Sequence, residues 1–449
     1  MTSSRFIPYP DTKDSGIEWL GQIPTHWDRS RLSAWARTGY KTFTDGDWVE
    51  SPFITDEGIR LVQTGNIGTG AYREQGFRYI SENSFDELGC TEVLPGDVLI
   101  CRLADPVGRA CLAPDLGVRM ITSVDVAILK PRTKTQARYL VHLLSSAPYL
   151  SWMSAVCRGG TRDRVSRSFL GGVRVPVPLR DEQQAIADFL DRETAKIDAL
   201  VEKKEQLVEL LQEKRTALIT HAVTKGLDPE APMKDSGIEW LGQIPTHWVE
   251  TRLGWSVEVN GGHTPDTGEL RYWDGEIPWV TPKDMKRRVI TDSLDHVSEE
   301  ALAETSLRLL ASGNVLIVVR GMILAHTFPV AVLRAPATIN QDMKALLPTD
   351  GLESDYLAYL LEGISEFILS LVEESAHGTR RLQTELWKRV QLFLPPAIEQ
   401  ARIIEHLDSE IAKIDALIAK VEEAIERLKE YRIALISAAT TGKIDVRVL

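Results

Sequence analysis

A fifteen-residue sequence that occurs twice constrains the fold of this chain more than any other feature. The sequence KDSGIEWLGQIPTHW spans residues 13–27 and returns unchanged at residues 234–248 of a chain of 449 residues. A chain of this length is too long for one hydrophobic core and suits two or more domains. Identical segments in the two halves predict two copies of one structural unit, in which this segment meets the same surroundings.

Shorter matches continue the repeat in the same order along both halves. They are Glu182-Gln183 with Glu399-Gln400, AKIDAL at residues 195–200 and 412–417, and Ala217-Leu218-Ile219 with Ala434-Leu435-Ile436. Most of the residues between these matches differ. We interpret the chain as a tandem duplication in which the frame has stayed alike while the contents of the two halves have diverged.

Two long helices are predicted within this frame, near residues 182–222 and 399–439. Apolar residues recur there at alternating steps of three and four, and neither stretch contains Gly or Pro. A helix of about forty residues with a narrow apolar stripe needs a partner helix, and the repeat makes its twin the simplest partner. We therefore expect the two helices to form an antiparallel coiled coil.

The segments outside the helices mix the signals of strands and helices. Strand-like runs occur at residues 98–101 and 314–319, and helical stretches occur near residues 136–144 and 354–371. We predict an α+β fold with two similar domains of mixed α/β structure, separated by the antiparallel helices in a circular, pseudo-twofold repeat. The expected boundaries are a first domain at residues 1–180, a first helix at 181–226, a second domain at 227–396 and a second helix at 397–449.

Hydropathy and cysteine usage predict a cytoplasmic protein with no membrane partner. No apolar run reaches the roughly eighteen residues that a membrane helix needs, and the N-terminal residues lack the layout of a signal peptide. The four cysteines are Cys90, Cys101, Cys111 and Cys157, and they show no CxxC spacing. This spacing favours buried free thiols over a disulfide framework or a zinc site.

Taken together, the repeated motifs resemble those of the DNA-specificity subunit of type I restriction-modification enzymes. The resemblance is carried by GIEWLGQIPTHW at residues 16–27 and 237–248, the Gly-Thr-Arg turns at Gly160 and Gly378, the PVPL and FLPP segments at Pro176 and Phe393, and the helices headed by Glu182 and Glu399. Each motif is weak alone. In this order and in two copies the motifs are specific, and they cover nearly the whole chain.

This resemblance implies a non-catalytic protein that binds double-stranded DNA. It implies two target recognition domains, each of which reads one half of an asymmetric, bipartite sequence, and two spacer helices that fix the gap. Separate subunits then supply the chemistry: two copies of a modification (methyltransferase) subunit, which bring S-adenosylmethionine, and a restriction/translocase subunit. The chain itself is expected to hold no cofactor and no metal.

The residues agree with a non-catalytic role but leave two alternatives open. The chain lacks an Asn/Asp-Pro-Pro-aromatic motif for base methylation, a glycine-rich S-adenosylmethionine loop and a Walker A sequence, and its nine histidines show no metal-ligand spacing. The alternatives are a duplicated coiled-coil scaffold that never contacts DNA, and a self-contained methyltransferase. A salt-dependent DNA shift assay tests the first, and S-adenosylmethionine binding by the chain alone tests the second.

The charge of the chain is acidic overall but unevenly distributed. The net charge is −12, whereas DNA-binding proteins use Lys and Arg to displace counterions from phosphates. Residues 132–180 carry nine basic side chains and one acidic one, so a basic face can coexist with the acidic total. The second half is less basic, and we expect partner subunits to supply much of the phosphate contact there.

Side chains that read base edges are predicted in two glycine-containing turns. Arg can bond guanine, and such turns let the backbone approach phosphate. The candidates are Arg158, Thr161, Arg162 and Arg164 in RGGTRDR, and Thr379, Arg380 and Arg381 in HGTRR. A second group in LVQTGNIG and WVTPKDM comprises Gln63, Thr64, Asn66, Thr281 and Lys283. The competing interpretations are an ordinary helix start with solvated arginines for the first group and a polar turn for the second.

Overall fold

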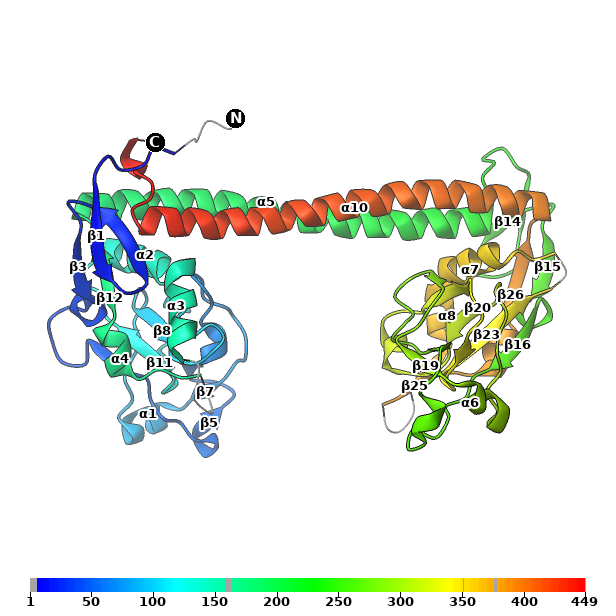
Figure 1. Cartoon of the computed structure of the whole chain (residues 1–449), viewed down its shortest axis with the longest axis horizontal. Coiled ribbons are helices and arrows are strands. Elements are labelled where there is room, and N and C mark those ends of the chain that lie inside the picture. The colour runs from blue at the N-terminus through cyan, green and yellow to red at the C-terminus, as the bar shows by residue number, and fades with distance from the viewer. Residues whose placement is uncertain (1–5, 158–162, 350, 375–377, 449) are drawn as a thin grey trace. The chain divides into compact units, whose positions relative to one another are not determined.

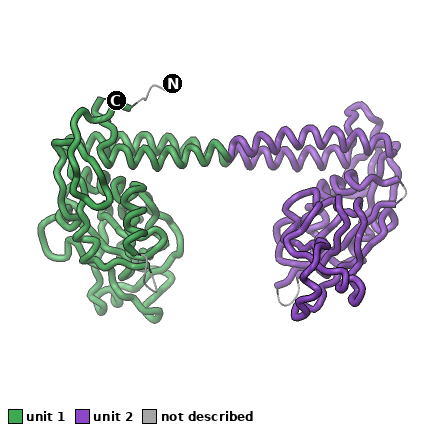
Figure 2. Tube along the Cα trace, in the orientation of Figure 1, with its two compact units in different colours: residues 1–205, 423–449 green, residues 206–422 purple. Residues whose placement is uncertain are grey.

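The chain folds into two compact units, each of which holds one part of both long helices. The structure is a computed structural model that describes residues 6–157, 163–349, 351–374 and 378–448. Unit 1 comprises Met1–Glu205 with Glu423–Leu449, and unit 2 comprises Gln206–Glu422 (Figure 2). The long helices are α5 (Arg180–Lys225) and α10 (Ala397–Thr440), labelled in Figure 1. The prediction of an α+β fold with two long helices is confirmed.

Unit 1 contains two four-stranded sheets, in the strand orders β10-β6-β7-β5 and β4-β11-β8-β9. Their strands are β4 (Phe43–Asp45), β5 (Ile54–Thr55), β6 (Ile59–Val62), β7 (Tyr79–Ile80), β8 (Val98–Cys101), β9 (Ala110–Leu112), β10 (Met120–Thr122) and β11 (Val126–Leu129). Two antiparallel pairs accompany them: β1 (Thr12–Ile17) with β2 (Leu20–Pro24), and β3 (Asp28–Arg31) with β12 (Arg174–Val177). The shorter helices are α1 (Glu82–Leu88), α2 (Lys134–Leu143), α3 (Ala147–Cys157) and α4 (Arg167–Gly172).

Unit 2 contains a five-stranded sheet in the order β16-β23-β20-β21-β18 and a three-stranded sheet in the order β19-β17-β22. Their strands are β16 (Val257–Gly261), β17 (Ile277–Val280), β18 (Val289–Ile290), β19 (Asp295–Val297), β20 (Val315–Val318), β21 (Val330–Leu333), β22 (Thr338–Ile339) and β23 (Met343–Pro348). The antiparallel pairs are β13 (Met233–Asp235) with β14 (Gln243–Pro245), β15 (Val249–Arg252) with β26 (Gln391–Leu394), and β24 (Val372–Glu374) with β25 (Arg380–Leu382). The shorter helices are α6 (Glu299–Glu304), α7 (Ser354–Gly363), α8 (Ser365–Ser370) and α9 (Thr384–Lys388).

Equivalent strands, β8 in unit 1 and β20 in unit 2, lie in the hydrophobic cores of the two units. All four residues of β8 and all four residues of β20 are buried, and each strand pairs with a neighbour on both sides. The glycines that precede these strands, Gly96 in the sequence GDVLI and Gly313 in the sequence GNVLI, have φ angles of 91° and 94°, a backbone conformation that favours glycine. The strands predicted at residues 98–101 and 314–319 are confirmed as β8 and β20.

One predicted helix is divided. Residues 354–371 form α7 and α8, which meet at Ile364, rather than one continuous helix. Gly363 ends α7 against α5, and a Cβ atom at Gly363 would lie 2.6 Å from Val223 Cγ2. This close approach is a long-range contact, so local periodicity does not reveal it.

The repeated fifteen-residue segment packs at the end of a long helix in both units. In unit 1 it supplies Pro24 and the buried Trp27, which pack on Gly442, just beyond α10. In unit 2 it supplies the buried Trp248, which packs on Gly226, just beyond α5. The φ angles of the two glycines are 73° and 77°, a left-handed conformation that ends a helix readily at glycine. The two copies of the segment therefore meet equivalent surroundings, as the repeat predicts.

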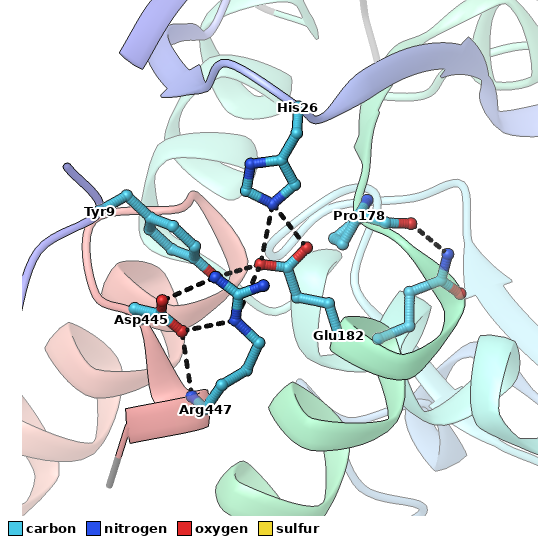
Figure 3. A network of polar contacts seen from close by, with 7 residues as sticks. Tyr9, His26, Pro178, Glu182, Asp445 and Arg447 are labelled. Atoms are coloured by element: carbon cyan, nitrogen blue, oxygen red, sulfur yellow. Dashed lines mark hydrogen bonds and ion pairs between the residues drawn. The ribbon is translucent and has the colours of Figure 1, made fainter. Parts of the chain in front are cut away.

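A glutamate at the start of each long helix bonds to the same segment. Figure 3 shows the polar contacts around Glu182 in unit 1. Glu182 is almost fully buried. Glu182 Oε1 accepts a hydrogen bond from Tyr9 at 2.6 Å, and Glu182 Oε2 lies 3.0 Å from His26 Nε2. Burial and the hydrogen bond to Glu182 raise the pKa of the Tyr9 hydroxyl well above its ordinary value. In unit 2, Glu399 Oε2 lies 2.7 Å from His247 Nε2.

The C-terminal residues complete this group in unit 1. The Asp445 amide donates a hydrogen bond to the Ile7 carbonyl at 2.8 Å. Arg447 Nη2 bonds Asp445 Oδ2 at 2.7 Å, and Arg447 Nε lies 3.7 Å from Glu182 Oε1. The hydrogen bond from Arg447 holds the pKa of the Asp445 carboxyl below its ordinary value. The two ends of the described chain are thus joined by non-covalent contacts.

The long helices run antiparallel in each unit. In unit 1, Arg432 Nε of α10 donates a hydrogen bond to Asp198 Oδ1 of α5 at 2.8 Å. In unit 2, Arg215 Nε of α5 lies 3.3 Å from Asp415 Oδ1 of α10. In both pairs a residue early in one helix meets a residue late in the other, which confirms the predicted antiparallel pairing.

Two further observations concern the hydropathy and the thiols. No helix in the described ranges combines the length and the apolar character needed to span a membrane. All four cysteines are free, and Cys90, Cys101 and Cys111 are buried. Burial raises the pKa of the Cys111 thiol to about 12. The prediction of buried free thiols is confirmed for these three, whereas Cys157 is free but only half-buried.

Candidate nucleic-acid interface

Three chain segments meet in each unit at a place that we call the loop edge. In unit 1 the loop edge consists of residues 63–66, residues 122–125 and the Leu103–Arg164 backbone bridge. In unit 2 it consists of residues 281–284, residues 339–342 and the Arg320–Arg381 bridge. Matching backbone bonds join the segments: Ser123 N to Val62 O at 2.9 Å and Arg102 N to Asp125 O at 2.8 Å, and in unit 2 Asn340 N to Val280 O at 3.0 Å and Val319 N to Asp342 O at 2.8 Å. Most of the predicted site residues that the structure describes lie on this edge.

The first segment of each loop edge is a turn that follows a strand. Residues 63–66 follow β6, and residues 281–284 follow β17; each of these strands pairs in parallel with a short strand, β10 or β22. The backbone N–H of Gln63 donates a hydrogen bond to Asn66 Oδ1, and the backbone N–H of Thr281 donates one to Asp284 Oδ2, both at 2.8 Å. The two turns share one geometry although their sequences differ, because a carboxylate or amide oxygen three residues ahead closes each.

The second group of predicted site residues lies in these two turns but plays two different parts. Asn66 is buried, and its Nδ2 donates to the carbonyls of Arg73 and Gln75 at 2.9 and 2.8 Å. Thr281 is also buried, and its Oγ1 donates to Asp284 Oδ2 at 2.9 Å. Both side chains hold the shape of their own turn. Gln63 and Thr64 are partly exposed and Lys283 is exposed, so these three are open to a ligand.

A buried arginine that the sequence pattern did not identify fixes the loop edge of unit 1. Arg109 Nε donates to the Ile67 carbonyl at 2.6 Å, and Arg109 Nη2 donates to the Thr64 carbonyl at 2.9 Å. Its Nη1 donates to the Leu103 carbonyl at 3.1 Å. One guanidinium therefore ties the turn at residues 63–66 to the Leu103–Arg164 bridge. The sequence pattern does not reveal this role, because the partners Thr64 and Ile67 lie more than forty residues away in the sequence.

An aspartate stands at the same place in both loop edges but pairs with different arginines. In unit 1, Asp125 Oδ1 lies 2.8 Å from Arg164 Nη2. In unit 2, Asp342 Oδ1 lies 3.9 Å from Arg320 Nε, the residue opposite Arg381. The arginine that is equivalent to Arg164 is Arg381, and among the described residues it has no carboxylate within 4.0 Å.

A basic cavity lies at the loop edge of unit 2. Its volume is about 550 Å³, and the residues that line it are Val319, Arg320, Gln341, Lys344, Thr379, Arg381, Leu382 and Thr384. Three of these described residues are cations and none is acidic. The sequence pattern did not identify Arg320, Gln341 or Lys344. They lie on or beside separate strands, and the pairing of β20 with β23 brings them together.

The first group of predicted site residues has three outcomes. Arg158, Thr161 and Arg162 lie outside the described residues. Arg164 forms the ion pair with Asp125, and Arg380 Nη2 lies 3.2 Å from Glu374 Oε2. Thr379 and Arg381 line the basic cavity. Contact of any of these residues with DNA stays a prediction.

Possible metal ligands are dispersed. In the part of the chain that the structure describes, no group of three or more His, Cys, Asp and Glu side chains could hold a metal ion. The chemistry that the loop edges offer is hydrogen bonding and ion pairing from Arg, Lys, Gln and Thr side chains.

The chain is similar to known proteins in sequence and in fold. The family described as type I restriction modification DNA specificity domain matches residues 62–210 and 245–427. The EcoR124I/EcoR124II type I restriction enzyme specificity subunit of Escherichia coli is 27% identical over 330 residues, which cover 71% of this chain and 72% of that subunit. The StySPI type I restriction enzyme specificity subunit of Salmonella potsdam is 20% identical over 440 residues, which cover 95% of this chain and 91% of that subunit.

A solved structure shares the fold. It comes from a study of complex assembly and conformational transition in the type I R-M system, and it matches with a TM-score of 0.66 at 20% identity. The match covers 94% of this chain and 99% of the other chain.

Proposed function

Because this chain belongs to the type I restriction modification DNA specificity family, we propose that it reads an asymmetric, bipartite DNA sequence, one half-site with each unit. The observation that carries this proposal is the pair of loop edges. Two backbone bonds and one backbone bridge match between them, whereas some of the side chains at equivalent positions differ: Leu103 stands where unit 2 has Arg320, and Ala127 stands where unit 2 has Lys344. Equal frames with unequal side chains suit two readers of unlike sequences.

The loop edges have the properties that base reading requires. Sequence is read by a few side chains that reach base edges, while other contacts fix the position of the protein on the duplex. Arg and Lys donate to guanine, and Gln can bond adenine. Gln63 and Thr64 in unit 1, and Lys283, Thr379 and Arg381 in unit 2, are described candidates that have partly or fully exposed side chains and no ion pair among the described residues. The bonds that close the turns hold the backbone in one shape before DNA arrives, which reduces the entropy lost on binding.

The long helices act as a spacer in this proposal. Helix α5 has 46 residues, so it is about 69 Å long at about 1.5 Å per residue. Each unit contains the start of one long helix and the end of the other, held by the repeated segment, Glu182 or Glu399, and Gly442 or Gly226. A helix pair anchored in this way at both ends would fix the number of base pairs between the two half-sites.

The chain is proposed to act without catalysis, as a platform for partner subunits. We assign methyl transfer, with S-adenosylmethionine, to two copies of a methyltransferase subunit, and cleavage to a restriction/translocase subunit. Support for two copies comes from Leu200 and Leu417, which occupy equivalent places in the repeat and are 48% and 45% exposed. Because the repeat relates these two leucines, a partner that contacts one of them would meet an equivalent position at the other.

A DNA shift assay tests this function against a scaffold that never contacts DNA. The full chain is assembled with its methyltransferase subunit and mixed with duplex DNA at increasing salt concentrations. We expect binding whose affinity falls steeply with salt, because cations on the loop edges release counterions from phosphates. Absence of a shift even at low salt would exclude the function. Tight binding of S-adenosylmethionine by the chain alone would instead favour a self-contained methyltransferase.

A further inference from the structure

The two loop edges differ in how their basic side chains are neutralised. In unit 1, Asp125 lies 2.8 Å from Arg164, and Asp45 lies 3.3 Å from Arg102 and 3.2 Å from Arg167. Every one of these arginines therefore has a carboxylate partner. Among the described residues, these three arginines of unit 1 are therefore neutralised by carboxylates of the same unit.

The basic cavity of unit 2 lacks this compensation. The nearest carboxylate to Arg320 is Asp342, at 3.9 Å, and neither Lys344 nor Arg381 has a carboxylate within 4.0 Å among the described residues. Glu373 stands across the strand pair from Arg381 but accepts a hydrogen bond from Gln383 instead. Arg320 and Arg381 are cross-strand neighbours, and like charges in that position repel each other. Such a cluster is stabilised by a ligand that presents hydrogen-bond acceptors.

We propose that this cavity reads a guanine base and that Arg381 contacts the guanine N7 and O6 atoms. This inference rests on the proposed function, because it names a base in the half-site that unit 2 reads. Guanine presents two adjacent acceptors in the major groove, and the planar guanidinium of arginine matches them with two parallel donors. Arg320 and Lys344 supply further donors around the same cavity.

Asp342 favours a base edge over a phosphate group as the ligand. Its carboxylate lies beside Arg320, so a phosphate in the cavity would meet a like charge. The major-groove edge of a G·C base pair presents acceptors on guanine without a formal charge, so it avoids this repulsion. The Arg381 guanidinium, which has no carboxylate partner among the described residues, is therefore better matched by the uncharged guanine edge than by a phosphate.

Unit 1 provides the internal comparison. Its equivalents of Arg320 and Lys344 are Leu103 and Ala127, and Arg164, its equivalent of Arg381, is paired with Asp125. The inference therefore assigns guanine reading by this arginine to one half-site only.

The test measures methylation rates on duplexes that carry single base-pair substitutions in the target. The complete chain, assembled with its methyltransferase subunit, is compared with the Arg381→Ala and Arg381→Lys variants. The unmodified complex should require a G·C pair at one position of one half-site. Both variants should lose discrimination at that position by about 10- to 100-fold, while discrimination in the other half-site is retained. Lysine keeps the charge but not the two parallel donors, so it should not rescue the reading.

Arg334→Ala is the matched control. Arg334 is also a partly exposed arginine of unit 2, and its Nη2 lies 2.6 Å from Asp355 Oδ2. This variant should leave discrimination unchanged at every position. Thermal unfolding of all variants reports on folding, and a folded Arg381→Lys protein decides the matter if Arg381→Ala unfolds.

Three outcomes would overturn the inference. The first is equal weakening on all sequences with rescue by lysine, which would identify a phosphate contact. The second is altered discrimination at a position that does not require guanine, and the third is unchanged discrimination. If the unmodified complex instead recognises no bipartite sequence at all, the proposed function fails rather than this inference alone.

Discussion

Glu182 and Glu399 occupy the same position of the repeat, but their side chains are buried to different degrees. The side chain of Glu182 is 1% exposed and that of Glu399 is 26% exposed, although both bond a histidine of the repeated segment. Identity of sequence therefore does not mean identity of energetic contribution. The difference arises from Tyr9 and the C-terminal residues, which cover Glu182 in unit 1.

Replacement of these glutamates tests that difference. Glu182→Ala leaves the Tyr9 hydroxyl and His26 without their shared partner, so we expect it to lower the free energy of unfolding by about 1–3 kcal/mol. Glu399→Ala should lower it by less, because the Glu399 side chain is partly exposed and water can replace its contact with His247, although Trp248 Nε1 also loses an acceptor. Urea denaturation measures both values, and an equal or larger loss for Glu399→Ala would contradict the account.

The residues of the loop edges show where prediction from sequence succeeds and where it stops. The pattern located the two turns at residues 63–66 and 281–284, because polar residues follow a strand-like run there. It did not separate Gln63, which is partly exposed, from Asn66, whose side chain is used inside its turn. It also did not identify Arg320 and Lys344, since only the pairing of distant strands brings them together.

The ends of the long helices are the elements that the repeat preserves most clearly. Gly226 and Gly442 both adopt left-handed conformations beyond a helix end, and both contact the repeated segment. Their surroundings differ in rigidity. A Cβ atom at Gly442 would lie 2.2 Å from Pro24 Cδ, whereas one at Gly226 would first meet the side-chain oxygen of Glu399 at 3.1 Å.

Replacement of Gly226 and of Gly442 by alanine should therefore lower the stability of the protein by different amounts. The left-handed conformation alone costs about 1–2 kcal/mol for a residue with a Cβ atom. Gly442→Ala should exceed this cost because the proline ring cannot move aside as a flexible side chain can, whereas Gly226→Ala should stay near it. Denaturation midpoints of the two variants provide the comparison, and a greater loss for Gly226→Ala would refute the packing argument.

The exposed leucines Leu200 and Leu417 of the long helices lead to a separate prediction about the binding of methyltransferase subunits. Leu200→Asp and Leu417→Asp each place a charge on an exposed helix position, so the chain itself should stay folded. Each substitution should remove one bound methyltransferase subunit, and the double substitution should remove both. Native mass spectrometry of the assembled complexes counts the subunits. Retention of two subunits by both single variants would show that these positions do not contact the partner.

Helical periodicity was sufficient to predict the two long helices, but not the helices in the rest of each unit. Helices α5 and α10 extend only a few residues beyond the predicted stretches at residues 182–222 and 399–439, because an uninterrupted apolar stripe specifies a helix locally. The division between α7 and α8 could not be predicted. It depends on the packing of Gly363 against α5, which lies far away in the sequence.

Considered as a whole molecule, the chain is organised by its duplication. Each compact unit contains part of both long helices, and unit 1 also contains both the N-terminal and the C-terminal residues of the chain. The repeated sequence made this organisation predictable, because identical segments require equivalent surroundings. The bases that each unit is proposed to read were not predictable, since they would depend on side chains in loops that diverged between the two halves.

Insertion of one heptad into each long helix tests the spacer proposal. The matched positions are after Glu205 in α5 and after Glu422 in α10, where a seven-residue insertion keeps the apolar stripe in phase. The insertion adds about 10 Å to each helix. The gap in the recognised DNA should grow by about three base pairs at about 3.4 Å per base pair, with both half-sites unchanged. A gap of unchanged length would contradict the spacer role.

A map of methylated adenines in DNA that has been modified by this chain and its methyltransferase subunit tests the function as a whole. Every methylated site should contain two unlike half-sites separated by a gap of one fixed length and variable sequence. A continuous palindromic motif, or methylation without a recurring motif, would contradict it.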